Sequence, residues 1–307
     1  MKHLILRIAI SALLLSGGQI QADSITTFNN TVATDLANAL TSGGSGGITI
    51  TNAVLSANTL PSGEASSGIF TTSGSNGYGL SGSGIVISSG NAAQDGTSGP
   101  FISSVTTDFG TNATAAQTAL LNQVASAPGG WHDVTELHIT FSAGPTTNHV
   151  FFNTVFASAE YPDFVGSFID GFGLFLNGTN IAFAGGQPTN IDNPLMVNTA
   201  FPTDGGVDGS VYQTTPVGGL LVENGSPVIT YGGAVTPGST GNTLDFIIAD
   251  ANDNVLDTMA MIEGLGNAPP SGVPEPATVT LVSIGAVGFL VPAWRRRKQP
   301  IKAVAQR

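Results

Sequence analysis

A short loop near the end of the chain, between two segments that we expect to be strands, is rich in oxygen-bearing side chains. It contains Asp250, Asn252, Asn254 and Asp257. Ca²⁺ prefers such oxygen ligands, and the D-x-N-x-N spacing from residue 250 matches the start of an EF-hand loop. The glycine and the distal glutamate of that motif are absent, and no helices are expected beside the loop. The sequence therefore favours an ordinary Asx-rich turn, with a bound Ca²⁺ cofactor as the alternative.

Three further carboxyl groups, those of Glu160, Asp163 and Asp170, lie in the phenylalanine-rich part of the chain. A glycoside hydrolase needs two suitably spaced carboxyl groups, one as the acid and the other as the base or nucleophile. Such a pair usually lies among aromatic and polar sugar-binding side chains, which this sequence does not identify. We therefore expect these acids to be solvated or hydrogen-bonded to the backbone. A secreted carbohydrate-active enzyme is retained as an alternative function.

Other common catalytic groups are missing from the chain or stand alone. There is no Cys, and the histidines form no H-x-x-x-H pair for zinc. No G-x-S-x-G motif stands between a predicted strand and a predicted helix, where a serine hydrolase places its nucleophile. We therefore predict that the protein is not an enzyme and has no cofactor other than the Ca²⁺ considered above.

Charge is divided between the ends and the middle of the chain. All eight Lys and Arg lie before residue 8 or after residue 294, whereas all 20 Asp and Glu lie between Asp23 and Glu275. Residues 23–294 therefore have no permanent cation, so their acids must be solvated, accept hydrogen bonds or bind ions. So acidic a segment repels nucleic acid, which excludes a nucleic-acid-binding function. Without Cys, stability must come from packing rather than from disulfides.

The first 22 residues have the features of a secretory signal peptide. Lys2 and Arg7 form a basic start, residues 8–15 form an apolar core, and Ala22 and Asp23 flank the expected cleavage site. We expect this segment to direct the chain to the Sec translocon. A buried N-terminal helix is the alternative interpretation.

A membrane-spanning segment is expected at the other end of the chain. Residues 277–294 carry no charge, and as a helix they would be about 27 Å long, close to the hydrocarbon thickness of a bilayer. The tail that follows, residues 295–307, begins with Arg295, Arg296, Arg297 and Lys298. By the positive-inside rule this tail stays in the cytoplasm and the acidic body is exported. We predict a single transmembrane helix here, a buried core helix being the alternative.

A proline-rich linker, residues 268–276, precedes this helix and ends in Val273, Pro274, Glu275 and Pro276. The Pro-Glu-Pro triplet, the helix and the basic tail together resemble the PEP-CTERM sorting signal of exported Gram-negative proteins. The resemblance implies recognition by an exosortase, which cuts near the triplet and releases or re-anchors the body. The prolines favour an extended backbone that suits a protease-like cleft. The inner membrane would then hold the precursor transiently, and the mature form would be at the cell surface or secreted.

The body, residues 23–267, has the pattern of an all-β domain. Leu137, Ile139 and Phe141 alternate with polar residues, and Asn177-Gly178 predicts a type I′ hairpin turn after which the strand resumes through Phe183. Two short helices are expected at residues 32–40 and 114–125, the second with a capping box. We predict one jelly-roll-like β-sandwich.

The body also resembles a known family. Residues 149–183 (HVFFNTVFASAEYPDFVGSFIDGFGLFLNGTNIAF) are similar to the signature of the choice-of-anchor L domain. Residues 243–264 (TLDFIIADANDNVLDTMAMIEG) and 83–90 (SGIVISSG) are similar to its closing and early segments. The resemblance implies an exported all-β module that is attached to cells by varied C-terminal signals. It implies fold and location rather than a reaction.

These observations together predict a non-enzymatic surface or extracellular-matrix protein that is processed by an exosortase. The expected role of the body is structural or adhesive, in a biofilm or exopolysaccharide, because an acidic surface can bridge polysaccharide through divalent ions. A permanently anchored periplasmic binding module is the second alternative, beside the secreted enzyme named above.

Overall fold

Two antiparallel β-sheets dominate the part of the chain that the computed structural model describes, namely residues 25–42, 44–72, 79–80, 82–93, 106–197 and 218–269. The larger sheet has the order β1-β3-β4-β15-β6-β12-β11, with β13 also paired to β6. Its strands are β1 (Ile25–Asn29), β3 (Ser67–Thr72), β4 (Ser83–Ser88), β6 (His149–Ser158), β11 (Met196–Val197), β12 (Gly219–Leu221), β13 (Ile229–Ala234) and β15 (Thr258–Gly266). The predicted all-β class is confirmed.

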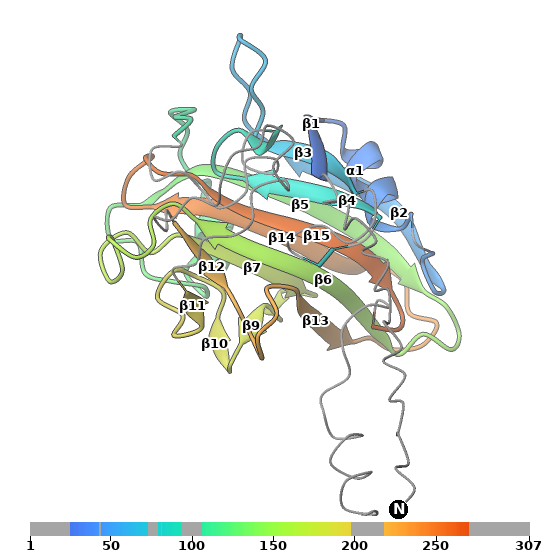
Figure 1. The fold of residues 1–307 in the computed structure, drawn as a ribbon. Helices are drawn as coiled ribbons and strands as arrows, with labels where there is room; N and C mark the ends of the chain where they lie inside the picture. Colours follow the sequence, from blue (N-terminus) through green and yellow to red (C-terminus); the bar gives the residue numbers. More distant parts are fainter. Residues whose placement is uncertain are drawn as a thin grey trace, which may run out of the picture. The chain divides into compact units, whose positions relative to one another are not determined.

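The smaller sheet has the order β2-β5-β14-β7-β8 and lies against the larger one (Figure 1). Its strands are β2 (Ile48–Ser56), β5 (Trp131–Ala143), β7 (Gly171–Leu176), β8 (Thr179–Asn180) and β14 (Asn242–Ala251). A separate two-stranded sheet contains β9 (Phe183–Ala184) and β10 (Gln187–Pro188). The main core lies between the two large sheets, and Phe152 of β6 and Phe246 of β14 meet in it edge to face, with ring centroids 5.2 Å apart.

Strands β6, β7, β14 and β15 are buried on both faces over most of their length. Strand β5 instead shows the alternation that the sequence predicts. Along β5, Leu137, Ile139 and Phe141 are buried while the residues between them are partly exposed. In β7 all six residues are buried, because Phe172 and Leu174 enter the main core while Phe175 belongs to a second apolar cluster outside the smaller sheet. A third cluster lies on the outer face of the larger sheet. Strands covered on both faces read as continuous apolar runs rather than as alternating patterns.

Both predicted helices are present, and each covers apolar surface. Helix α1 (Ala33–Leu40) lies beside β2 and β4 and buries Leu36 and Leu40 in the main core (Figure 1). Helix α3 (Ala115–Leu121) covers the outer face of the smaller sheet through Leu121. It ends at Leu121 rather than at the predicted residue 125, because the chain tightens there into turns closed by i→i+3 hydrogen bonds. Within the described residues, helices take up far less of the chain than strands do.

Helix α3 starts with a capping box formed by Thr114 and Gln117. The Gln117 N–H donates to Thr114 Oγ1 at 3.3 Å, and the Thr114 N–H donates to Gln117 Oε1 at 2.9 Å. Thr114→Ala is therefore expected to lower the free energy of unfolding by about 1 kcal/mol. Thr118→Ala, the same change inside the helix, is expected to alter it by less than about 0.5 kcal/mol. Equal losses for the two variants in urea unfolding would contradict a special role for the cap.

The turn at Asn177-Gly178 has the predicted form, but the strand after it is short. Both residues have positive φ, +51° and +79°, as a type I′ turn requires. The predicted continuation of this strand through Phe183 is wrong. Strand β8 ends at Asn180, whose Oδ1 accepts from the Ala182 N–H at 3.0 Å, and Phe183 belongs to the separate two-stranded sheet, 44% exposed. The Ile181 N–H still donates to the Leu174 carbonyl of β7 at 2.7 Å, and the side-chain turn at Asn180 then directs Phe183 away from that strand.

The cleavage site at Ala22 and Asp23, the triplet around Glu275, the helix at 277–294 and the basic tail all lie outside the described residues. Within the described ranges, no helix combines the length and the apolar character needed to cross a bilayer.

Candidate functional site

Two buried carboxyl groups are neighbours at one end of the smaller sheet. Asp170 immediately precedes β7, and Asp250 is the penultimate residue of β14. The two strands are antiparallel with Ala249 opposite Gly171, so the next pair of positions brings Asp250 and Asp170 together. Both side chains are buried. The sheet register, rather than the sequence spacing, thus creates this pair.

Two further buried carboxyl groups lie at the corresponding end of the larger sheet. Asp257 immediately precedes β15, and Glu160 follows the end of β6 by two residues. Here Thr258 lies opposite Ser158 and the Ala159 N–H donates to the Asp257 carbonyl, so Asp257 lies opposite Ala159 and Glu160 is one position further along. Each of the two carboxyl side chains is only 1% exposed.

One hydroxyl group links Asp170 of the smaller sheet to the end of the larger sheet. Thr258 Oγ1 donates to Asp170 Oδ2 at 2.6 Å and lies 2.8 Å from Ser158 Oγ. The other oxygen of Asp170 accepts from the Ala251 N–H at 2.9 Å. These contacts place the four acids at one end of the sandwich, and we refer to Glu160, Asp170, Asp250 and Asp257 as the acidic cluster.

Three members of the acidic cluster each leave one buried oxygen without a hydrogen-bond partner. These oxygens are Glu160 Oε2, Asp250 Oδ1 and Asp257 Oδ2. Asp257 Oδ1, by contrast, accepts from the Thr107 N–H at 2.9 Å. A buried acceptor without a partner destabilises a fold by about 1–3 kcal/mol, and more if it is charged. Because residues 23–294 contain no Lys or Arg, no permanent side-chain cation from this segment can offset these charges.

Burial raises the pKa of every carboxyl group in the acidic cluster. Removal from water, with the nearby charges of Asp170 and Asp253, raises the pKa of Glu160 to about 9. Burial raises the pKa of Asp257 to about 6 against the lowering effect of its hydrogen bonds. Burial likewise holds the pKa values of Asp170 and Asp250 well above the ordinary range. At neutral pH the cluster therefore favours states in which its charge is neutralised.

The acidic cluster combines residues from the two groups singled out in the sequence. Asp250 and Asp257 come from the loop considered for Ca²⁺, and Glu160 and Asp170 come from the acids considered for catalysis. The remaining members lie elsewhere: Asp163 is exposed and Asn254 is half-buried. No local spacing signals this combination, because about 90 residues separate the two groups along the chain.

Asn252 stabilises the loop rather than joining the acidic cluster. Its Oδ1 accepts from the Gly129 N–H at 2.7 Å, and its Nδ2 donates to the Ser167 carbonyl at 2.9 Å. Its φ of +77° is left-handed, a conformation that Asn tolerates well. The local Asx turn that the sequence favours is made by the next residue, Asp253, whose Oδ1 accepts from the Val255 N–H at 3.4 Å. Within the described ranges, no three acidic or histidine side chains are already arranged as a metal site.

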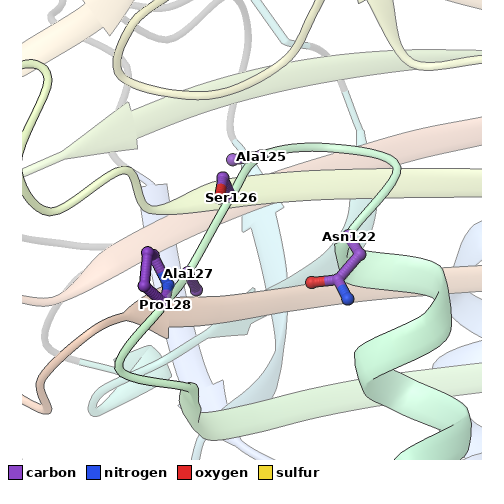
Figure 2. Close-up of a pocket in the computed structure, with 5 residues that line it drawn as sticks. All are labelled: Asn122, Ala125, Ser126, Ala127 and Pro128. Carbon is purple, nitrogen blue, oxygen red and sulfur yellow. The ribbon is translucent and has the colours of Figure 1, made fainter.

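A shallow pocket of about 320 Å³ follows helix α3 (Figure 2). Asn122 at the end of the helix and the loop that continues from it form the lining, which comprises Asn122, Ala125, Ser126, Ala127 and Pro128. Asn122 Oδ1 accepts from the indole N–H of Trp131 at 3.0 Å and is therefore engaged. The lining holds no titratable side chain, so this pocket offers no acid or base to activate the Ser126 hydroxyl.

Comparison with protein families gives the class of protein. The family model described as Choice-of-anchor L domain matches residues 24–266, which is most of the chain. The chain therefore belongs to the choice-of-anchor L domain family, whose members are exported and associated with the cell surface and which is not a known enzyme family. No curated protein and no solved structure shows significant similarity to the chain.

Proposed function

We propose that this protein is a non-enzymatic component of the cell surface or extracellular matrix that an exosortase processes at its C-terminal tail. The observation that carries the proposal is the order of segments after the family domain. The Pro274–Pro276 triplet is followed by the uncharged residues 277–294 and then by a basic run beginning at Arg295. Family membership supports the surface location of the body.

The physical properties of the tail fit a temporary anchor. An uncharged helix of about 27 Å stops in a bilayer, and adjacent cations fix its end on the cytoplasmic side. The prolines of the triplet hold the backbone extended just outside the membrane, where a cleaving enzyme can bind it. Cleavage there removes the only Lys and Arg residues that follow the body. The product is an acidic body at the cell surface.

The burial of the acidic cluster favours a structural or adhesive role over glycoside hydrolysis. Glu160 is 1% exposed and Asp170 fully buried, so a sugar has no access to this pair without rearrangement of the sandwich. The exposed acids of the body can instead bind a polysaccharide through bridging divalent ions. We therefore propose a matrix-associated role, and place the secreted enzyme and the permanently anchored periplasmic module as alternatives.

The mass of the mature protein tests the processing. We expect mass spectrometry of the protein from the native host to give a C-terminus near Pro274. Joint replacement of Arg295, Arg296, Arg297 and Lys298 by glutamine is expected to reduce the processed fraction several-fold, because the cytoplasmic stop is lost. Lys302→Gln, outside the basic run, is the control and should be processed normally. A mature wild-type protein that retains Arg307 would contradict sorting and support the permanently anchored module.

A further inference from the structure

We propose that Asn224 is a site of spontaneous covalent modification, at which the folded protein converts the side-chain amide to aspartate and isoaspartate. Asn177, which occupies a turn of the same backbone conformation, is protected by its contacts. Both residues are followed by Gly and lie in the body of the chain, so the inference does not depend on how the tail is processed.

The two turns share one backbone conformation. In Asn177-Gly178 the φ angles are +51° and +79°, and in Asn224-Gly225 they are +53° and +80°. Both pairs therefore have the left-handed backbone of a type I′ turn, which favours Asn followed by Gly. The first turn joins β7 to β8, and the second lies between Glu223 and Ser226, which form an isolated bridge. A difference in reactivity must therefore come from what surrounds each turn.

An Asn-Gly pair can lose ammonia without an enzyme. Solvent base removes the proton of the Gly225 N–H, the nitrogen forms a bond to Asn224 Cγ, and the Cγ–Nδ2 bond breaks. Ammonia leaves with a proton taken from water. Water then opens the resulting succinimide ring at either carbonyl group, giving aspartate or isoaspartate. Glycine favours the attack because it has no side chain, and the space around it is open, since a Cβ at residue 225 would meet no atom within 4 Å.

Contacts with β14 hold Asn177 in place. Its Oδ1 accepts from the Thr243 N–H at 2.9 Å, and its Nδ2 donates to Asn242 Oδ1 at 3.4 Å. Its backbone N–H donates to the Thr243 carbonyl at 3.0 Å. The carboxamide must turn towards the nitrogen of Gly178 before the ring can close, and this rotation breaks both side-chain contacts. The folded state therefore slows the reaction at Asn177.

Asn224 has no comparable restraint. The residue is exposed, and in the described part of the chain its side chain makes no hydrogen bond. Two backbone hydrogen bonds close the turn, one in each direction between Glu223 and Ser226, and both are 2.9 Å long. The bridge is isolated rather than part of a strand pair, and segments held by so few contacts open locally more readily than the interior of a sheet. Rotation of Asn224 into the ring-closing geometry is therefore accessible in the folded protein.

The modification changes the charge and the length of the backbone at a contact between two parts of the body. Glu223 Oε1 accepts from the Gly185 N–H at 2.9 Å, which ties the turn to the connection between β9 and β10. Conversion of Asn224 places a second carboxylate next to Glu223 in the chain, and isoaspartate also adds one methylene group to the main chain. We expect these changes to weaken the contact with Gly185, and the body to become more acidic as the protein ages.

Peptide mapping of the aged full chain tests the difference between the two turns. The protein in detergent is incubated for days at mildly alkaline pH and then digested, and mass spectrometry quantifies the amide-to-acid change at each site. We expect conversion at Asn224 to be several-fold faster than at Asn177. A third pair, Asn76-Gly77, lies outside the described residues and is quantified as a separate peptide.

Unfolding and one substitution provide the controls. In guanidinium chloride the two sites should react at similar rates, because the contacts that distinguish them are lost. Asn242→Ala removes the acceptor for Asn177 Nδ2, so it should speed conversion at Asn177 without changing the rate at Asn224. Equal rates at the two sites in the folded wild type would overturn the proposal. It is also overturned if Asn224 keeps its amide in the folded protein while both sites react in guanidinium chloride.

Discussion

Replacing Phe246 by alanine is expected to lower the free energy of unfolding by about 3–5 kcal/mol. Phe246 of β14 is fully buried and contacts Phe152 of β6 edge to face across the two sheets. Truncation removes this contact and leaves a cavity that two rigid sheets cannot close by collapsing. Urea unfolding of the full chain in detergent, followed by circular dichroism, measures the loss as a lower midpoint with an unchanged slope.

The matched control is the same substitution at a surface position. Phe183 lies in the small two-stranded sheet and is 44% exposed, so Phe183→Ala is expected to cost about 1 kcal/mol or less. If the two variants lost equal stability, the main core would not lie where Phe152 and Phe246 meet.

In the presence of a chelator, the protein is expected to become less stable as the pH rises from 5.5 to 8. The pKa of Glu160 is raised to about 9 in the folded state, whereas an unfolded chain has an ordinary glutamate value of about 4.3. Between these values the folded state binds a proton that the unfolded state has lost. The stabilisation is therefore complete below the unfolded pKa and is lost as pH rises through the folded pKa. Glu160 alone contributes a loss on the order of 3 kcal/mol over this window.

The other acids of the cluster add to the same trend over different ranges. Asp257, with a pKa of about 6, contributes mainly below that pH, and the raised pKa values of Asp170 and Asp250 act in the same direction. Urea midpoints at half-unit pH steps measure the slope, and Glu160→Gln should flatten it whereas Asp163→Asn should not. A stability that rose with pH across this window would contradict the burial of these groups.

Local features of this fold follow closely from the sequence. The capping box at Thr114 and Gln117, the positive φ values at Asn177 and Gly178, and the alternation along β5 each depend on residues within a few positions of one another. Side-chain size, backbone freedom and a nearby donor decide such features, so pattern reasoning recovers them.

Features that depend on pairing between distant strands were not predictable in the same way. The double-sided burial of β7 requires α3 to lie over the outer face of its sheet, which no pattern within β7 signals. The acidic cluster requires two sheet registers and the contact between Thr258 and Asp170, 88 positions apart. From the sequence its members appear as two unrelated groups, Glu160 with Asp170 and Asp250 with Asp257, about 90 positions apart. Only the folded structure brings them to the same end of the sandwich.

The position of the last two strands has a consequence for biogenesis. Strand β14 lies between β5 and β7 in one sheet, and β15 lies between β4 and β6 in the other. When a polypeptide crosses a membrane with its N-terminus first, β14 and β15 are the last strands of this domain to emerge. Neither sheet is therefore complete until nearly the whole domain has emerged. Until then the earlier strands have unpaired edges, which can form incorrect strand pairs. Mispairing of these exposed edges before β14 and β15 arrive is therefore the main hazard of this topology.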